Sequence, residues 1–543
     1  MNKFTEVVSR QLVEMLDDQQ EIAVIDVRDY GEYLTGHLWL ATRIPYACIE
    51  LKISRYVPRL DTRVVLIDRD QSLSGRTAAS LQTMGYGNLH VLKGGLNDWE
   101  DAGYPLIEGD YVLAHAFGLY INRVLGTPSI SAETLMRIKA SREKLVIIDS
   151  RDPADYQGSS LPGSINIPIA DLVQSVPDIV DDETTQIVVH CGGVTRAVLG
   201  AQTLIDAKFT NPVMWLEDGT TGWAIAGGNL QPGSESMDTP PSEEAKKYSR
   251  NTTRDLANRY NLIYIGALEI AQWKVNNQHR TCYLIDVRNH EKFLAGHYPG
   301  ALNIPGGELV GMMIDHIATY HARLCLMDDA DSACAEITAA WLLRNGWNDV
   351  VLLNDWERQP NLETGPEKSI DLKLPQPALP VLDTPELKKL LSEDSTRVAI
   401  LDFSHSSEYD KQHIPGAYWC LRSSIPQSLE GLDDNLQVVV VSRNDKLSQL
   451  IAIDIREITG RHCSILSGGT QEWLEQENPS ESGMSSALCE RLDVRLAPTH
   501  QTTDKKQEVL AGLQYSVDIR QHIFNRYQLD QPFPFNCLYP ESD

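Results

Sequence analysis

One pattern occurs four times in this sequence, and the repeat limits the folds that the chain can adopt. In each unit a short apolar run ends in an aspartate, which is typical of a buried β-strand. The aspartates are Asp26, Asp149, Asp286 and Asp402, so the units follow one another at intervals of 123, 137 and 116 residues. The total length of 543 residues, at about 150 residues per domain, agrees with three to four domains.

Each unit continues with the same elements in the same order. A glycine-containing turn follows the first strand, as between Pro162 and Pro168 in unit two. A further apolar run, a stretch with helical spacing and a last short strand come next. The further apolar runs are Val64–Ile67, Ile187–His190, Leu324–Met327 and Val438–Val441, and the closing tryptophans are Trp99, Trp223, Trp356 and Trp473. This alternation predicts four α/β modules, each with a mainly parallel sheet flanked by helices.

Composition shifts give the module boundaries. We place modules 1 to 4 at residues 1–107, 131–231, 263–360 and 381–479. The segments 108–130, 232–262 and 361–380 are then linkers, and 480–543 is a C-terminal tail. Apolar residues recur in the tail at helical intervals and predict a helix that packs on the modules or on a partner; they are Val509, Leu510, Leu513, Val517 and Ile519.

Charge and composition exclude several classes of protein. Asp and Glu number 75 against 48 Lys and Arg, so a net charge of −27 argues against binding to nucleic acid or to an anionic membrane. The sequence has no secretory apolar stretch and no membrane-spanning run, and we expect a cytoplasmic protein. The nine cysteines lack CxxC pairs and a histidine cluster, so we expect no disulfide framework, no metal site and no cofactor.

Four motifs together resemble the rhodanese family, which has the sulfurtransferase fold. They are Asp-x-Arg after the first strand, Pro-Gly-(Ser/Ala)-x-Asn-Ile-Pro, a strand that ends in cysteine, and Gly-Gly or Asp-Gly before tryptophan. The arrangement is similar to the four-domain bacterial thiosulfate sulfurtransferases, including Ala116-Phe117-Gly118 and Gly126-Thr127-Pro128 between modules 1 and 2. The resemblance implies four tandem rhodanese-like modules and a transferase that moves sulfane sulfur.

Only module 2 has a cysteine at the end of the strand that precedes its main helix. The aligned residues of the other modules are Asp68, Asp328 and Ser442. An aspartate cannot carry a persulfide and a serine without a base is a weak sulfur nucleophile, so we interpret modules 1, 3 and 4 as silent. Cys191 is the expected catalytic residue, and the residues expected to bind the substrate are Gly192, Gly193, Val194, Thr195 and Arg196.

The residue types of this loop fit sulfur chemistry. A thiolate is the attacking species, and consecutive backbone N–H groups at a helix N-terminus stabilise an anionic sulfur. Gly192 and Gly193 allow the backbone to curl around Cys191, and Arg196 adds a positive charge. We therefore expect sulfur transfer from thiosulfate or a related persulfide donor to cyanide or a thiol through a Cys191 persulfide.

Alternative functions remain open at this point. The chain could be a multi-module scaffold or sulfur-relay protein that passes a persulfide to a partner protein. A Cys-dependent phosphatase or arsenate reductase is less favoured, because phosphatases have five residues between cysteine and arginine, whereas Cys191 and Arg196 enclose four. The expected partners are small sulfur-containing anions and thiols, and a protein acceptor or an oligomer is compatible with the sequence.

Two polar features near Cys191 have simpler structural interpretations. The pair Asp149 and Arg151 recurs as Asp26/Arg28 and Asp286/Arg288 in modules without a thiol, so we predict a structural salt bridge. His190 ends a strand, and we expect it to pack or form local hydrogen bonds rather than act as a base. The other cysteines are expected to be small apolar residues or inert surface thiols.

Overall fold

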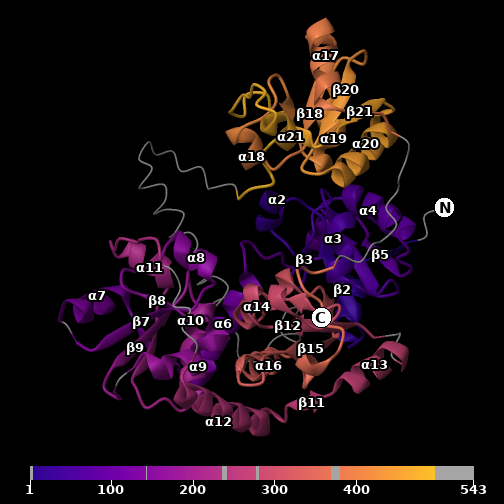
Figure 1. Ribbon diagram of the computed structural model, residues 1–543. Coiled ribbons are helices and arrows are strands. Elements are labelled where there is room, and N and C mark those ends of the chain that lie inside the picture. The colour runs from indigo at the N-terminus through magenta and orange to yellow at the C-terminus, as the bar shows by residue number, and fades with distance from the viewer. Residues whose placement is uncertain are drawn as a thin grey trace.

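The computed structural model describes residues 4–141, 143–180, 182–234, 241–276, 280–368 and 379–495 (Figure 1). The helix predicted around residues 509–519 and Cys537 lie outside these ranges. Each described module contains a mainly parallel sheet with helices on both faces, which confirms the predicted fold class.

The four sheets share one strand order, in which the first long strand lies next to the strand before the main helix. In module 1 the order is β1 (Thr5–Val7), β5 (Leu89–Leu92), β4 (Arg63–Ile67), β2 (Ile22–Asp26) and β3 (Thr42–Arg43). In module 2 it is β6 (Ser129–Ile130), β10 (Val213–Leu216), β9 (Gln186–His190), β7 (Leu145–Asp149) and β8 (Ile165–Asn166). These neighbours pair in parallel, and the long strands are apolar and buried because helices cover both faces.

Modules 3 and 4 repeat this arrangement. In module 3 the order is β11 (Ile263–Ile265), β16 (Val350–Leu353), β15 (Arg323–Met327), β12 (Cys282–Asp286) and β13 (Leu302–Asn303). In module 4 it is β17 (Val381–Leu382), β21 (Cys463–Leu466), β20 (Gln437–Val441), β18 (Val398–Asp402) and β19 (Tyr418–Trp419). Because the carboxyl ends of parallel strands meet at one edge, each module presents one edge at which loops gather.

The helices that cover the sheets have the following bounds. Module 1 contains α1 (Ser9–Asp17), α2 (Tyr30–Leu34), α3 (Ile49–Tyr56), α4 (Ser72–Thr83) and α5 (Gly95–Asp101). Module 2 contains α7 (Ala132–Ser141), α8 (Pro153–Gly158), α9 (Leu172–Ser175), α10 (Thr195–Asp206) and α11 (Gly219–Ile225). Module 3 contains α13 (Ala267–Asn276), α14 (His290–Ala295), α15 (Gly306–Gly311) and α16 (Cys334–Arg344). Module 4 contains α17 (Thr384–Asp394), α18 (Ser406–Lys411), α19 (Ile425–Glu430), α20 (Asp445–Thr459) and α21 (Gly469–Glu475).

Two of the segments expected as linkers contain helices. Segment 108–130 holds α6 (Val112–Leu125), and its last residues form β6 of the module 2 sheet. Segment 232–262 holds α12 (Glu243–Tyr260), which packs against α9 and α16 and so connects modules 2 and 3 (Figure 1). The buried side of α12 carries Ala245, Ser249, Thr252 and Leu256. Three of these four residues are small or polar, so the sequence shows no clear apolar stripe there.

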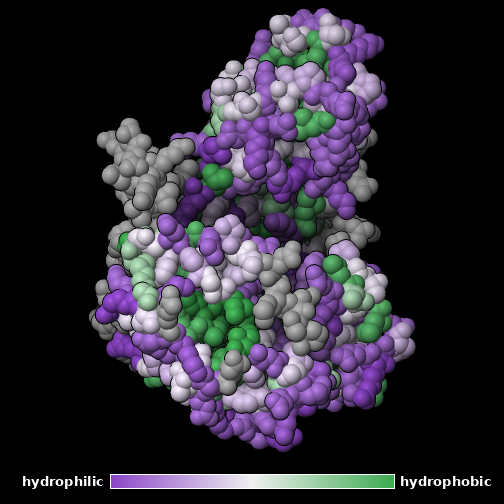
Figure 2. Space-filling view, turned by 60° about the vertical axis from the view of Figure 1, so that its left-hand side comes forward, coloured by the Kyte–Doolittle hydropathy of each residue, from purple (hydrophilic) through white to green (hydrophobic). Residues whose placement is uncertain are grey.

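Modules 1, 2 and 3 share one apolar core. A continuous cluster of buried side chains includes Val65 of module 1, Leu199 of module 2 and Leu326 of module 3. Phe117 of α6 meets Trp341 of α16 edge to face, with 6.1 Å between the ring centroids. The core of module 4 is separate from this cluster. The first three modules therefore form one packed body, on which module 4 lies (Figure 2).

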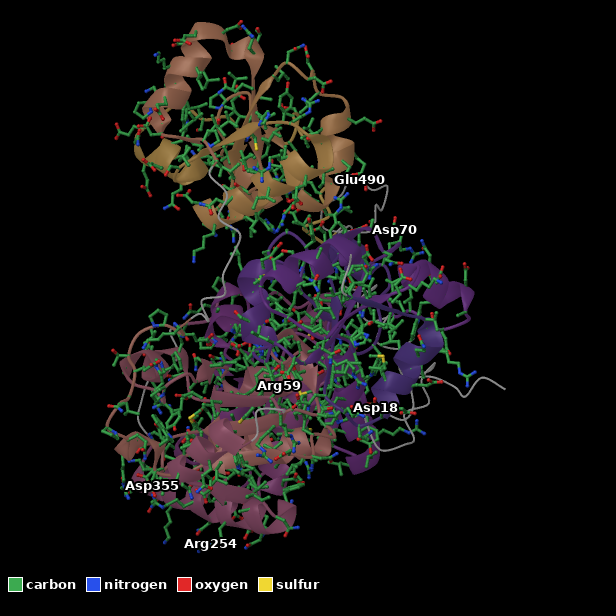
Figure 3. All side chains as sticks on the ribbon, turned by 90° about the vertical axis from the view of Figure 1, so that its right-hand side faces the viewer. Asp18, Arg59, Asp70, Arg254, Asp355 and Glu490 are labelled. Carbon is green, nitrogen blue, oxygen red and sulfur yellow. The ribbon has the colours of Figure 1, made fainter. Side chains whose placement is uncertain are left out.

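Module 3 also extends the sheet of module 1. Strand β14 (Thr319–Tyr320) pairs antiparallel with β2, with Thr319 opposite Ala23. At the same boundary Glu21 accepts a hydrogen bond of 2.6 Å from the backbone N–H of Thr281 and pairs at 2.8 Å with Arg59, which is labelled in Figure 3. Backbone pairing and a shared carboxylate thus fix the relative position of these two modules.

A buried ion pair joins module 4 to module 1. The Arg422 guanidinium binds Glu50 at 2.8 Å and Asp454 at 2.6 Å, and Tyr46 donates to Asp454 at 2.8 Å. Burial alone would raise the pKa of Glu50, but the neighbouring guanidinium outweighs it and holds that pKa below its usual value.

Among the described residues, no helix is both long enough and apolar enough to cross a membrane.

Replacing Arg422 by alanine leaves the carboxylate of Glu50 buried without its cation. We expect the free energy of unfolding to fall by about 3–5 kcal/mol, as for other buried pairs that lose one partner. Urea denaturation followed by tryptophan fluorescence measures this change. The control is Arg443→Ala, which removes a solvent-exposed pair with Glu408 and is expected to cost less than about 1 kcal/mol. Equal losses in the two variants would contradict the importance of this contact.

Candidate active site

Cys191 lies between β9 and α10, at the carboxyl edge of the module 2 sheet. Its side chain is buried, with 3% of the residue surface exposed. The backbone N–H of Gly193 donates a hydrogen bond to the sulfur at 3.3 Å, and Val194 provides the N-cap of α10. The thiol therefore faces an N–H group at the positive end of a helix, where an anionic sulfur is stabilised.

A second loop holds the cysteine loop in place. Gly219, which begins α11, has φ +52°, and a Cβ at this position would lie 2.1 Å from the carbonyl oxygen of Cys191. The N–H of Thr220 donates to that same carbonyl at 2.8 Å, and Thr221 Oγ1 donates to the carbonyl of Gly192 at 2.9 Å. The sequence does not single out the two threonines, although they directly follow the Asp-Gly turn before Trp223.

Helix α6 covers the cysteine loop from the segment between modules 1 and 2. Thr195 Oγ1 donates to the carbonyl of Ala114 at 2.8 Å. A Cβ on Gly118 would lie 2.7 Å from the Cα of Thr195, so the two backbones touch. Thr195, expected to bind the substrate, thus uses its hydroxyl group for this packing contact.

The charge of Arg196 is balanced by carboxylates. Its guanidinium binds Asp152 at 3.0 Å and Asp155 at 3.0 Å, both from the start of α8. Burial lowers the pKa of Arg196, but Cys191 and the two aspartates outweigh burial and raise it, so the side chain stays charged. The expectation of an added positive charge beside the thiol needs this correction: the guanidinium lies near Cys191, but two anions already neutralise it.

Module 3 completes one wall of the site. A Cβ on Gly311 of α15 would lie 3.1 Å from the Cγ of Arg196, so α15 packs directly on this arginine. Burial, together with the negative charge of nearby Asp152, raises the pKa of Glu308 on the same helix to about 7. No motif near Cys191 could have indicated this contact, because α15 belongs to a different module.

The Asp149–Arg151 pair is a structural salt bridge, as predicted. Arg151 donates through Nε and Nη2 to the two carboxylate oxygens at 3.0 and 2.8 Å. Burial raises the pKa of Asp149, yet the hydrogen bond from Arg151 and the nearby charges bring it below its usual value. The pairs Asp26/Arg28 and Asp286/Arg288 have the same geometry in modules without a thiol.

His190 is fully buried and packs locally, as predicted. Burial lowers its pKa to about 4, so the ring is neutral near pH 7. Its Nδ1 lies 3.5 Å from the carbonyl oxygen of Cys191, and its Nε2 lies 3.8 Å from Asp149. The ring therefore contacts the backbone of the loop and the buried salt bridge.

In modules 1, 3 and 4, the chain itself fills the loop that corresponds to the Cys191 loop. The carboxylate of Asp68 accepts hydrogen bonds from the N–H groups of Gln71 at 3.0 Å and Leu73 at 2.6 Å. Asp328 accepts one from Ala335 at 3.0 Å. Ser442 donates its hydroxyl to the carbonyl of Asn444 at 2.9 Å. A carboxyl group of the chain itself thus takes the place of the cysteine sulfur in modules 1 and 3.

The edge of the module 3 sheet that corresponds to the Cys191 edge of module 2 borders a cavity. Residues of α12 form part of its lining. Arg254 of α12 and Asp355, which precedes the 3₁₀ turn of Trp356, both line it (Figure 3). Burial raises the pKa of Asp328, at the inner end of this cavity, to about 7. The residues that line this cavity include no cysteine.

Burial disfavours the thiolate form of several other described cysteines. Burial raises the thiol pKa of Cys325, Cys334 and Cys420 well above the usual value, and that of Cys463 to about 11. Cys489 accepts a hydrogen bond from the N–H of Leu421 at 3.3 Å, and burial raises its pKa as well.

The chain belongs to the rhodanese family. The family model for the rhodanese-like domain matches residues 9–102, 131–226, 270–355 and 383–476, which is more than half of the chain. Each match lies within one of the four modules.

The chain is similar over its length to a solved structure, the thiosulfate sulfurtransferase from Pseudomonas aeruginosa. The two are 31% identical with a TM-score of 0.88, and the match covers 98% of this chain and 100% of the other. A sulfurtransferase from Allochromatium vinosum is 29% identical over 102 residues, or 19% of this chain and 94% of that protein. The HTH-type transcriptional regulator Rv0324 of Mycobacterium tuberculosis is 32% identical over 106 residues; the match spans 19% of this chain and 46% of the regulator.

Replacing Arg151 by alanine leaves Asp149 buried without its cation beneath the cysteine loop. We expect the free energy of unfolding to fall by about 3–5 kcal/mol, and Arg151→Lys to recover only part of it because an ammonium group lacks the paired geometry. Thermal and urea unfolding measure the change. The matched control, Arg137→Ala on the exposed side of α7, is expected to stay within about 0.5 kcal/mol of wild type. An Arg151→Ala protein as stable as this control would show that the pair is dispensable.

Proposed function

We propose that this protein transfers sulfane sulfur from thiosulfate, or from a related persulfide donor, to cyanide or a thiol acceptor through a persulfide on Cys191. One observation carries the proposal: of the four strands that precede the main helices, only that of module 2 leads directly into a cysteine, Cys191, and the N–H of Gly193 in the same loop donates to its sulfur, whereas Cys334 at the start of α16 in module 3 donates its thiol to the carbonyl of Val287. The similarity over the full length to a thiosulfate sulfurtransferase supports it.

The proposed reaction has two displacement steps at sulfur. The Cys191 thiolate attacks the outer sulfur of thiosulfate, a new S–S bond forms, and sulfite leaves with the electron pair of the old one. The acceptor then attacks the outer sulfur of the persulfide, and the Cys191 thiolate leaves with its electrons. Such a covalent intermediate gives ping-pong kinetics. The N–H of Gly193 stabilises the anionic sulfur in both steps.

The burial of the thiol favours small substrates. Cys191 lies beneath α6, and α15 of module 3 packs on the adjacent Arg196. A donor the size of thiosulfate and an acceptor such as cyanide or a small thiol fit this enclosure better than the surface of a protein partner. The relay of sulfur to a protein acceptor is therefore the second candidate function, and it requires these covering helices to move.

Mass spectrometry of the intact protein tests the proposal directly. Brief treatment with thiosulfate is expected to add about 32 Da, the mass of one sulfur atom, with release of sulfite, and cyanide is expected to remove this mass as thiocyanate. Cys191→Ala is expected to gain no mass, whereas Cys489→Ala behaves as wild type. Wild-type protein that gains no sulfur from thiosulfate or from a persulfide donor contradicts the proposed function.

Gly219→Ala is expected to displace the cysteine loop. The new Cβ would overlap the carbonyl oxygen of Cys191, at 2.1 Å, and the residue would also be held at positive φ. We expect the rate of persulfide formation to fall about 100-fold or more, because small displacements of reacting groups have effects of this size.

Gly95→Ala is the matched control for this variant. The added Cβ would lie 2.6 Å from the carbonyl oxygen of Asp68, so this variant introduces a comparable clash in module 1, which lacks the cysteine. We expect a comparable loss of stability with little change in persulfide formation. Equal loss of activity in the two variants would show that general destabilisation, rather than the position of the loop, is the cause.

A further inference from the structure

One peptide unit faces the sulfur of Cys191, and a side chain of the second loop binds its other end. This unit is the peptide between Gly192 and Gly193. Its N–H donates to the sulfur at 3.3 Å, and its carbonyl oxygen accepts a hydrogen bond of 2.9 Å from Thr221 Oγ1. The N–H and the carbonyl of a planar trans peptide point in opposite directions, so a bond that holds the carbonyl also sets the direction of the N–H.

The two glycines give this peptide little resistance of their own to rotation. A flip by about half a turn changes only ψ of Gly192 and φ of Gly193, and glycine adopts both signs of φ. The flipped peptide would turn its carbonyl oxygen toward the sulfur in place of its N–H, and the negative end of the peptide dipole repels an anion. The loop therefore needs a partner that holds the carbonyl on the far side.

Thr221 reaches this carbonyl because its own loop is anchored to the cysteine loop. The N–H of Thr220 donates to the carbonyl of Cys191 at 2.8 Å, and the N–H of Thr221 lies 3.4 Å from the carbonyl oxygen of Gly192. The hydroxyl group of Thr221, at 2.9 Å, is thus the closer of its two donors to that oxygen.

The corresponding positions of modules 1 and 4 differ in this contact. Asn97 of module 1 binds its loop through the backbone N–H, which donates to the carbonyl of Arg69 at 3.1 Å. Gln471 of module 4 directs its side chain to Glu475. Among these three described positions, the hydroxyl contact to the loop occurs in the module that contains the cysteine.

We propose that Thr221 is a positioning residue of the Cys191 site, whose hydroxyl group holds the Gly192–Gly193 peptide with its N–H directed at the sulfur. Thr221 acts through the peptide and does not bind the substrate. The N–H then stays in place while the thiolate attacks the sulfur donor and while it leaves the persulfide. This inference rests on the proposed function, since it concerns the two steps at Cys191.

Single-turnover release of sulfite from thiosulfate by the full-length protein tests the inference. Thr221→Val replaces the hydroxyl group by a methyl group of similar size. We expect the maximal rate to fall about tenfold, less than the hundredfold or more that follows the loss of a stabilising donor itself. The half-saturating concentration of thiosulfate is expected to stay within about twofold of the wild-type value, because binding of the donor is unchanged.

Two further variants separate the hydroxyl group from general packing. Thr221→Ser keeps the hydroxyl group and is expected to retain most of the wild-type rate. The matched control is Thr77→Val in α4 of module 1, which removes another hydroxyl group that donates to a backbone carbonyl, that of Leu73 at 2.9 Å. We expect the control to keep the wild-type rate, with a loss of stability in urea denaturation comparable to that of Thr221→Val.

Alkylation of Cys191 by iodoacetamide gives a second measurement that needs no sulfur donor. The thiolate is the reacting species, and without the N–H contact less of it is present near pH 7. A less stabilised thiolate is also more nucleophilic, so we expect Thr221→Val to slow the alkylation by only about threefold and Thr221→Ser to restore it. Mass spectrometry of the peptide that contains Cys191 measures the rate.

Three outcomes overturn the inference. They are a Thr221→Val protein with the wild-type maximal rate, a Thr221→Ser protein as slow as the valine variant, and an equal fall in the Thr77→Val control. Thr221→Ala, which cannot overpack the site, repeats the test if the valine variant does not fold. Failure of the proposed function is a separate result: wild-type protein then forms no persulfide, whereas alkylation of Cys191 still reports whether Thr221 directs the peptide.

Discussion

The architecture of each module depends on a buried aspartate at the end of its first long strand. In modules 1, 2 and 3 an arginine two residues later binds this carboxylate, and the aspartates are fully buried. In module 4 the N–H of Ser404 and the hydroxyl of Thr470 bind Asp402 instead. Without an arginine, burial raises the pKa of Asp402 above its usual value. In each module these hydrogen bonds and ion pairs hold the aspartate in place at the edge of the sheet from which the neighbouring loops extend.

The loop at that edge presents backbone N–H donors, and the modules differ in which acceptor occupies it. Modules 1 and 3 supply the carboxylates of Asp68 and Asp328, which accept hydrogen bonds from backbone N–H groups of their own chain. In module 2 the short Gly-Gly sequence leaves the corresponding place to the sulfur of Cys191. The same backbone arrangement thus holds a carboxyl group of the chain in modules 1 and 3 and a cysteine thiol in module 2.

Segments outside module 2 contribute to the site by packing. Helix α6, between modules 1 and 2, covers the loop through Ala114 and Gly118, and α15 of module 3 presses on Arg196 through Gly311. The first three modules share one core, so these contacts belong to one packed body. Module 4 lies outside this core and is held by the buried ion pair of Arg422 with Glu50. A module that lacks the reactive cysteine therefore still contributes packing contacts to the protein.

The sequence alone determined the fourfold α/β repeat, the Asp–Arg pairs and the position of the thiol, because strand patterns, short motifs and loop residues are local features. Tertiary structure alone decided what surrounds Arg196 and how the modules are joined. Glu308 lies more than one hundred residues from Arg196, and Arg422 lies far from Glu50, so no local pattern relates them. Helix α12 was missed because its buried side uses small and polar residues. Contacts between distant segments depend on how apolar surfaces of whole modules fit together, and this fit is a property of the folded chain.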